Sequence, residues 1–360
     1  MNGSVHSVSL RYNLCPFDVY LWPFASAVSI GGMVAMMGNA LIIWAVLKSP
    51  ELSSKCYQLM ANLAAADLLS SLAFCLYGVW IFMGYTCEYP ALTFSQWHCF
   101  LLNTPFVMSF NTGCLMIWIV GFDRFLSLWH PTYYLSLNTS RYVRFWTVLS
   151  WSYSLLFLGF GFCYGFESSV PVPTCVLPTA FAGASMKIWT TINVTLSIIV
   201  ILTYSLTYWK TADLKRKRHT RTAERQLRIT QRVMRSITIV MAVYAWTWFA
   251  TMFSILLVSS VLHCTPSTIF HTSLYVGVLA NINVGSNFFI YFTRSNEYRR
   301  AFVALFTCRA MPQRHSSVHS GCTTTRHNSR NCPPFEHSFL MSADAHSINE
   351  NGLTLAETDL

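Results

Sequence analysis

Charged side chains are scarce in this sequence. Only 11% of the 360 residues are Asp, Glu, Lys or Arg, whereas 53% are hydrophobic, and the mean hydropathy is +0.41. A soluble domain of ordinary composition carries about 25% charged residues. This shortage excludes a disordered protein and a disulfide-rich secreted mini-domain, and it argues against a soluble enzyme. The apolar surface exceeds what one soluble core can bury, so the composition indicates lipid surroundings.

Long continuous stretches of the chain contain no charged residue, or only one. Seven runs of about 20 residues or more are long enough to cross a hydrocarbon layer of about 30 Å as helices. The runs are residues 21–47, 56–85, 97–121, 145–166, 188–209, 236–264 and 266–293. The short alternating pattern of a membrane β-barrel is missing. Because backbone groups in lipid must pair within their own segment, the sequence predicts an all-α membrane protein with a seven-transmembrane helix bundle.

Positive charge is missing from one side of this predicted bundle. With the N-terminus outside the cell, the outer segments hold only Arg11 and Lys187, and the inner segments hold the other 22 of the 24 Lys and Arg residues. Lys and Arg gather in cytoplasmic loops, so we expect residues 1–20 to form an extracellular arm. No cleavable signal peptide is evident there. The net charge of +10 is mostly this topology signal, and nucleic acid is not an expected partner.

Position-specific residues distinguish one class of seven-helix protein from another. In chain order they are Gly38-Asn39, Leu63–Asp67, Cys99, Asp123-Arg124-Phe125, Trp151, Cys175, Tyr204, Tyr244–Trp248 and Asn287–Tyr291. In order and spacing this set resembles the rhodopsin-like (class A) G-protein-coupled receptors. The resemblance covers nearly the whole bundle.

Two longer runs narrow the resemblance. Gly121–Ser127, followed by His130-Pro131, and Ser286–Phe302 resemble the nematode serpentine chemoreceptors, and class SX most of all. The neuropeptide receptors of the FMRFamide type share the Phe-for-Pro change at Phe288 and are the nearest alternative. A membrane transporter is a weaker alternative, because it needs polar residues in several spans and broken helices.

The resemblance implies a switch at the inner end of the third span. Arg124, held by Asp123, would lie in the cytoplasmic mouth that receives a heterotrimeric G protein. Tyr204 and Tyr291 resemble the tyrosine pair that meets the neighbourhood of this arginine in the active state. The alternative for Arg124 is an ordinary arginine that extends to the membrane interface.

An aromatic toggle residue is implied for the sixth span. Trp248 matches the toggle position, with Tyr244 four residues earlier in the usual aromatic place. A competing alignment places Trp246 at the toggle position, but it would put Ala242 at the aromatic position four residues earlier. The alternative is that these aromatic side chains only pack or anchor the helix at the interface.

Asp67 is the only charged residue in the seven runs. An ionisable residue at this depth is costly and indicates a functional site. The resemblance implies a polar network of Asp67 with Asn39 and Asn287, often around a sodium ion. The position that usually supplies a sodium-binding serine is Gly113 here, which leaves sodium uncertain. The alternative is a hydrogen-bonded packing cluster with no switching role.

The 12 cysteines show no metal-ligand spacing, and no set of His, Asp and Glu converges from several spans, so we expect no metal, no cofactor and no enzyme activity. The resemblance implies a disulfide between Cys99 and Cys175. A second disulfide, between Cys15 and Cys264, is a weaker hypothesis. Four further cysteines are expected to be small packing residues: Cys56, Cys75, Cys114 and Cys163.

The chain after the last span divides into two parts. Residues 294–308 have the pattern of an amphipathic helix at the membrane interface, ending at Cys308, which is either palmitoylated or a free thiol. Residues 309–360 read as a disordered cytoplasmic tail. The tail ends in Thr358–Leu360, which matches a PDZ-domain ligand. At the other end of the chain, Asn2 opens a glycosylation sequon.

Two further absences bear on function. The prolines that this class carries in spans five, six and seven are replaced by Leu196, Ala250 and Phe288, so the hinges must come from elsewhere. Phe106 stands where amine receptors carry an aspartate, so a biogenic amine is not expected as ligand. The sequence therefore predicts a G-protein-coupled receptor for an extracellular small molecule. We expect it in the plasma membrane, with sensory-neuron cilia as one location.

Overall fold

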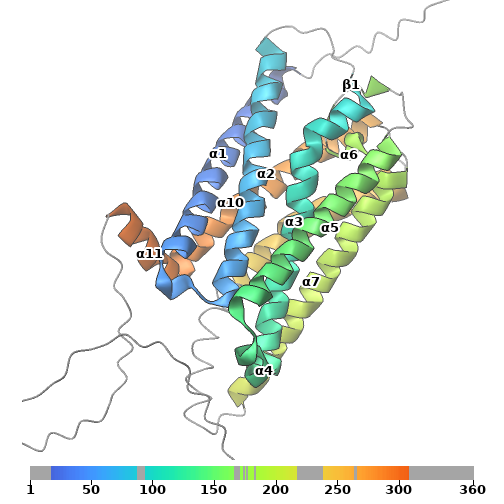
Figure 1. Ribbon diagram of the computed structural model, residues 1–360. Coiled ribbons are helices and arrows are strands. Elements are labelled where there is room, and N and C mark those ends of the chain that lie inside the picture. Colours follow the sequence, from blue (N-terminus) through green and yellow to red (C-terminus); the bar gives the residue numbers. More distant parts are fainter. Residues whose placement is uncertain are drawn as a thin grey trace, which may run out of the picture. The chain divides into compact units, whose positions relative to one another are not determined.

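The structure, a computed structural model, describes residues 18–86, 94–165, 171–172, 175, 177–181, 184–216, 238–262 and 266–307. Seven helices in these ranges are long and apolar enough to cross a membrane. They run side by side as a bundle (Figure 1). The predicted all-α seven-helix fold is confirmed.

The helices follow the charge-free runs and extend beyond several of them. The spanning helices are α1 (Asp18–Lys48), α2 (Lys55–Thr86), α3 (Gln96–Trp129), α5 (Thr139–Gly165), α7 (Ala184–Arg216), the sixth span (Thr238–Ser259) and α10 (Pro266–Arg294). The short elements are η1 (Pro50–Leu52), β1 (Phe94–Ser95), α4 (Pro131–Ser136), β2 (Pro171–Val172), α6 (Leu177–Ala180) and α11 (Asn296–Phe306). The third span continues eight residues past 121, because the charges at its end pair with each other within the protein.

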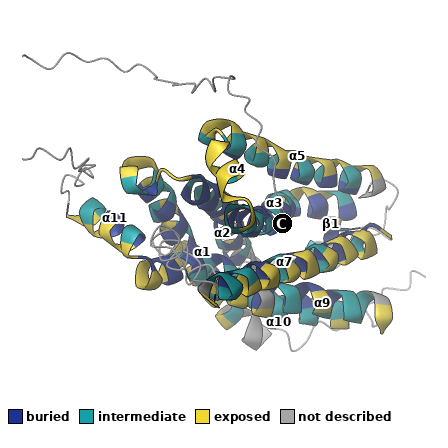
Figure 2. Ribbon diagram, turned by 90° about the horizontal axis from the view of Figure 1, so that it is seen from below, coloured by how far each residue is buried: buried dark blue, intermediate teal, exposed yellow. Residues whose placement is uncertain are grey.

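Helix α3 is the central helix of the bundle. It packs against α2, α5 and α7, and most of its side chains are buried. In contrast, α5 and α7 expose large apolar side chains along their outer sides (Figure 2). Apolar side chains on the outside of a helix bundle are expected where lipid is the solvent, so this pattern agrees with a multi-pass membrane protein.

The two ends of α3 carry different features. At its start, a disulfide joins Cys99 to Cys175, with a Cα–Cα distance of 5.3 Å, which confirms the predicted bridge. Beside it, β1 and β2 pair in antiparallel fashion, with Phe94 opposite Val172. We call this the disulfide end of the bundle. The opposite end, which contains Arg124, is called the arginine end.

The sixth span is an irregular helix, although its described residues contain no proline. It contains two π-helical stretches, η2 (Ala245–Phe249) and η3 (Leu257–Val261), on either side of α9 (Ala250–Leu256). Leu262 N donates to Leu257 O, five residues back, at 2.9 Å. Such π-bulges interrupt the regular hydrogen-bond ladder and are a recognised cause of helix kinks. The first of these stretches ends directly before Ala250, the position at which this class usually carries a proline.

Helix α11 has the predicted amphipathic character. Ser295 caps it, because its hydroxyl accepts a hydrogen bond from Tyr298 N at 3.3 Å. Tyr298 and Phe302 are fully buried, whereas Arg299 and Arg300 are exposed. The ring of Tyr298 stacks on that of Tyr291 in α10, with centroids 5.0 Å apart. The amphipathic helix after the last span is therefore confirmed.

Several predicted sites lie outside the described residues. These are the sequon at Asn2, the bridge between Cys15 and Cys264, the lipid site at Cys308, the tail at residues 309–360 and the PDZ ligand at Thr358–Leu360.

A close contact between α3 and α7 gives a stability prediction. A Cβ on Gly121 would lie 2.2 Å from Cε2 of Tyr204, whereas a Cβ on Gly159 in α5 meets nothing within 4 Å. We expect Gly121→Ala to lower the free energy of unfolding by about 1–3 kcal/mol through overpacking. Gly159→Ala should leave it unchanged or raise it by up to about 1 kcal/mol, since alanine favours helix. Thermal denaturation of the purified protein measures both, and equal effects would contradict this packing.

Candidate functional site at the two ends of the third span

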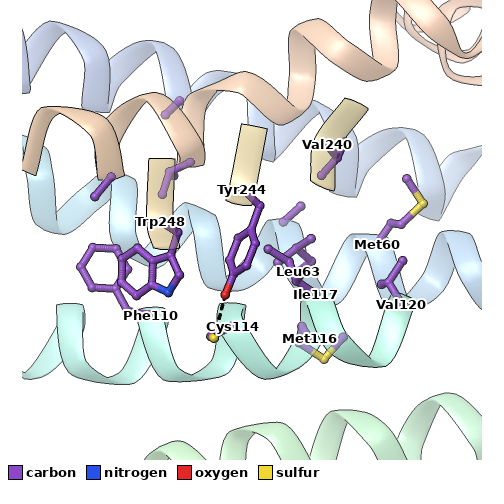
Figure 3. Close-up of a cluster of buried hydrophobic side chains, with 14 of the residues drawn as sticks. Met60, Leu63, Phe110, Cys114, Met116, Ile117, Val120, Val240, Tyr244 and Trp248 are labelled. Atoms are coloured by element: carbon purple, nitrogen blue, oxygen red, sulfur yellow. Dashed lines mark hydrogen bonds between the residues drawn. The ribbon is translucent and has the colours of Figure 1, made fainter. Parts of the chain in front are cut away.

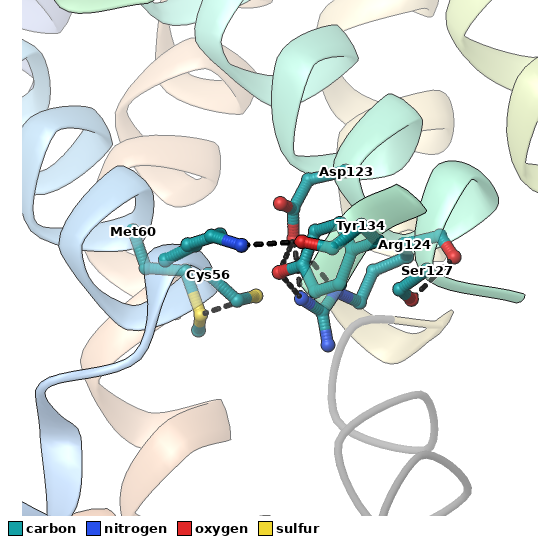
Figure 4. Close-up of polar contacts among 7 residues, drawn as sticks. Cys56, Met60, Asp123, Arg124, Ser127 and Tyr134 are labelled. Carbon is teal, nitrogen blue, oxygen red and sulfur yellow. Dashed lines mark hydrogen bonds and ion pairs between the residues drawn. The ribbon is translucent and has the colours of Figure 1, made fainter. Parts of the chain in front are cut away.

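A buried ion pair lies on α3 at the arginine end of the bundle. Arg124 Nε donates to Asp123 Oδ2 at 2.9 Å, and Arg124 Nη2 makes a second, ionic contact with the same oxygen (Figure 4). Asp123 is fully buried and Arg124 nearly so. Charges removed from water need a partner with good geometry. The pair provides this partner, and it agrees with the sequence-based expectation for these two residues.

Tyr134 completes this pair from α4. Its hydroxyl accepts a hydrogen bond from Arg124 Nη2 at 2.9 Å and donates to Asp123 Oδ2 at 3.4 Å. Lys55 of α2 donates to the backbone oxygen of Tyr134 and lies 4.3 Å from its ring centroid. Burial raises the pKa of the Tyr134 hydroxyl, so it stays protonated and able to donate. We call Lys55, Asp123, Arg124 and Tyr134 the arginine cluster.

Tyr204 and Tyr291, the two tyrosines predicted to act in a switch, make no hydrogen bond to this cluster that the structure shows. Tyr204 donates to the backbone oxygen of Ile117, two turns before Arg124, at 3.3 Å. Tyr291 is buried against Tyr298 of α11. Both side chains therefore hold neighbouring helices together in this conformation.

The predicted polar network is assembled only in part. Asn287 Nδ2 of α10 donates to Asp67 Oδ2 at 2.7 Å. Asn39 instead donates to two backbone oxygens, those of Ala35 at 3.0 Å and Val284 at 3.2 Å. Asn39 thus links α1 to the α10 backbone and makes no direct hydrogen bond to Asp67 that the structure shows.

The position expected to supply a sodium-binding hydroxyl holds none. Gly113 has no side chain, and a Cβ there would meet only Asp67 Oδ1, at 3.9 Å, while Asp67 Oδ2 accepts the hydrogen bond from the Asn287 amide. Among the described residues, no group of three or more His, Cys, Asp or Glu side chains gathers to hold a metal.

Tyr244 of the sixth span points toward Cys114 of α3, and a hydrogen bond joins the two side chains (Figure 3). The Tyr244 hydroxyl lies 2.9 Å from Cys114 Sγ and 3.2 Å from Ser197 Oγ, and Ser197 donates its own proton to Asn193 O at 2.8 Å. Since a hydroxyl has one proton, Tyr244 must donate to Ser197 and accept from the Cys114 thiol. We call Cys114, Tyr244 and Ser197 the central chain; it joins α3, the sixth span and α7.

Trp248 is the tryptophan of the sixth span that faces inward. It is 2% exposed and its ring lies 4.7 Å from that of Phe110 in α3, whereas Trp246 is 78% exposed. The register that assigns the toggle position to Trp248 is the one in which the indole reaches the core. The π-helical stretch η2 contains both residues.

A cavity of about 80 Å³ opens above Trp248, toward the disulfide end. Phe106 is buried in its wall, with ring centroids 4.9 Å from Phe74 and 5.5 Å from Phe110. The lining comes from five of the seven spanning helices and from α6: Phe24, Val28, Phe74, Tyr77, Asn103, Phe106, Phe110, Leu177, Pro178, Trp248, Thr251, Met252, Ile255, Ser273, Leu274, Val276, Gly277 and Ala280. None of these side chains is charged.

Comparison with known proteins decides the family. A sequence profile of the serpentine-type seven-transmembrane chemoreceptors, Srsx, matches residues 32–306. The chain belongs to this family of G-protein-coupled receptors. Family membership implies a receptor that binds a ligand and couples to a G protein, rather than an enzyme.

Receptors for several kinds of ligand are also similar to this chain, two of them over about three quarters of its length. The allatostatin-A receptor of Bombyx mori is 24% identical over 291 residues, which is 77% of each chain. The lysophosphatidic acid receptor 3 of Homo sapiens is 23% identical over 276 residues, 75% of this chain and 74% of that receptor. The chemokine XC receptor 1 of Mus musculus is 25% identical over 154 residues, 40% of this chain and 43% of that receptor.

Sequence reasoning missed four residues of the receptor's polar clusters. Tyr134 and Lys55 come from segments outside the motifs, and Cys114 and Ser197 gave no signal beyond packing. One local signal did exist for Tyr134: Pro131 is the first residue of α4, the position at which proline starts helices.

The central chain gives a prediction on stability. Tyr244→Phe keeps the ring but removes the hydroxyl, so Cys114 loses its acceptor and Ser197 loses its donor. We expect the free energy of unfolding to fall by about 1 kcal/mol, the usual net value of a hydrogen bond. Thermal denaturation of the purified receptor gives the measurement. Tyr275→Phe is the matched control, because Tyr275 is 72% exposed on α10; equal losses in the two variants would contradict the prediction.

Proposed function

We propose that the receptor binds a small extracellular molecule in the cavity and signals through a heterotrimeric G protein at the arginine end. In this proposal it lies in the plasma membrane with its N-terminus outside the cell. One observation carries the proposal: Trp248 lines the cavity and belongs to the π-helical stretch that begins directly after Tyr244 of the central chain. A ligand in the cavity therefore contacts the helix segment best placed to bend.

Activation is a shift between two populated conformations. A ligand that binds the open conformation more tightly raises its share by that difference in affinity. Movement of the sixth span about η2 would break the central chain, which holds Tyr244 against α3 and α7. Arg124 would then leave Asp123 and Tyr134 and become available to a G protein.

A neuropeptide is the second candidate ligand. The similarity to an allatostatin-A receptor over 77% of the chain favours it. The cavity favours a small molecule, because about 80 Å³ is well below the roughly 300–1,000 Å³ of sites for drug-sized ligands.

Loss of Arg124 tests the coupling site. We expect Arg124→Ala to abolish ligand-promoted second-messenger signals when the receptor is expressed with promiscuous G proteins and screened against small metabolites and short peptides. Arg124→Lys should also signal little, since an ammonium lacks the planar fork of donors that an arginine would present to a G protein. Surface labelling of the intact cells must show both variants at the membrane. Full signalling by Arg124→Ala would refute the role given to this residue.

Loss of the Tyr134 hydroxyl tests the closed arrangement. Hydrogen bonds to charged groups contribute about 1.5–3 kcal/mol, and about 1.4 kcal/mol is tenfold in a population. Tyr134→Phe should therefore raise ligand-independent nucleotide exchange about tenfold. Tyr133→Phe is the control, because the neighbouring Tyr133 is 57% exposed. Unchanged basal exchange in Tyr134→Phe would show that this hydroxyl does not hold Arg124 in place.

A further inference from the structure

The chemistry of the cavity wall restricts the ligand more narrowly than the proposed function does. The wall contains no charged side chain, and its largest surfaces are the rings of Phe106, Phe110 and Trp248. A buried charge needs a charged or strongly hydrogen-bonding partner. The described lining offers neither an acid for an ammonium group nor a base for a carboxylate or phosphate.

Two hydroxyl groups of the wall already donate hydrogen bonds within the protein, whereas the Nε1–H of Trp248 makes no hydrogen bond that the structure shows. Thr251 Oγ1 donates to Thr247 O at 2.7 Å and to Val276 O at 3.1 Å. Ser273 Oγ donates to Ile269 O at 2.6 Å.

Asn103 behaves in the same way at the disulfide end. Its Nδ2 donates to Cys99 O at 2.9 Å and to Cys175 Sγ at 3.3 Å. Because hydroxyl and amide oxygens keep free lone pairs, these three side chains can still accept hydrogen bonds from a ligand.

Gly277 of α10 leaves part of the cavity open. It lines the cavity, and a Cβ built on it meets nothing within 4 Å. A larger side chain at this position would therefore enter the empty space without displacing its neighbours. The cavity of about 80 Å³ has room for one compact molecule.

We propose that the ligand is a compact, uncharged, mostly apolar molecule whose single polar group both donates and accepts hydrogen bonds, as the hydroxyl group of an alcohol does. This inference rests on the proposed function, because it names the ligand class of the same cavity.

The probes are octanol and benzyl alcohol, each compared with its charged counterparts: octanoate and octylammonium, benzoate and benzylammonium. Binding is measured on the full-length receptor in lipid nanodiscs as a saturable rise in thermal denaturation temperature. Nucleotide exchange on an added G protein is measured separately. We expect the alcohols to bind at least about tenfold more tightly than their charged counterparts.

Two glycine substitutions distinguish alcohol binding in the cavity from alcohol uptake into the lipid. Gly277→Leu should weaken alcohol binding at least about tenfold by filling the space. Gly159→Leu is the control, because Gly159 also meets nothing within 4 Å but lies on the exposed side of α5, away from the cavity. If Gly277→Leu does not fold, Gly277→Ala should still weaken binding of octanol more than that of the smaller benzyl alcohol.

Three results would overturn the proposed ligand class. They are equal binding of a charged counterpart, equal responses of the two leucine variants, and no saturable binding of either alcohol. Exchange promoted by a peptide without any alcohol binding would overturn the ligand class and leave the receptor function intact. Alcohol binding that Gly277→Leu removes, with no effect on exchange, would support the ligand class and refute the proposed function.

Discussion

The absence of water inside a bilayer is the constraint on which the rest of this structure depends. Every polar group in the bundle must find its partner within the protein. Asp67 finds Asn287, and Asp123 finds Arg124 and Tyr134. The contacts of Asp67 with Asn287 and of Asp123 with Tyr134 join different helices, so these polar side chains help to determine which helices are held together. The contacts that satisfy the buried polar groups therefore include those that the proposed switch would have to break.

Helix α3 has a covalent contact at one end and non-covalent contacts along the rest of its length. At one end the disulfide of Cys99 fixes it covalently, and at the other Arg124 is held by contacts that can be broken. Between them, Cys114 takes part in hydrogen bonding with the sixth span. A rigid end, a weak thiol contact and a reversible ion pair therefore follow one another along one helix. Such an order lets the disulfide end keep its shape while the arginine end changes.

The sequence was sufficient for what depends on length, charge and local pattern. The spans follow from charge-free runs, and the inward register of Trp248 follows from its spacing to Tyr244. The position of Tyr134 could not be predicted, because it depends on how α4 folds back under α3. The same holds for Asn39, whose partner is a backbone oxygen of α10 and not a motif residue. The missing prolines did not show where the sixth span departs from a regular helix, because a π-helix has no comparable single-residue signature.

The similar receptors show how little of such a bundle the ligand determines. Receptors named for a peptide and for a lysophospholipid share about a quarter of their residues with this chain over three quarters of its length. A scaffold whose main polar contacts lie away from the cavity, as those of Asp67 and Arg124 do, places few demands on the cavity walls. Positions such as Gly277, where added atoms would meet no neighbour, can then vary without loss of stability. The residues that select the ligand at the disulfide end can therefore vary. The arginine cluster is constrained, because a buried charge without its partner costs free energy.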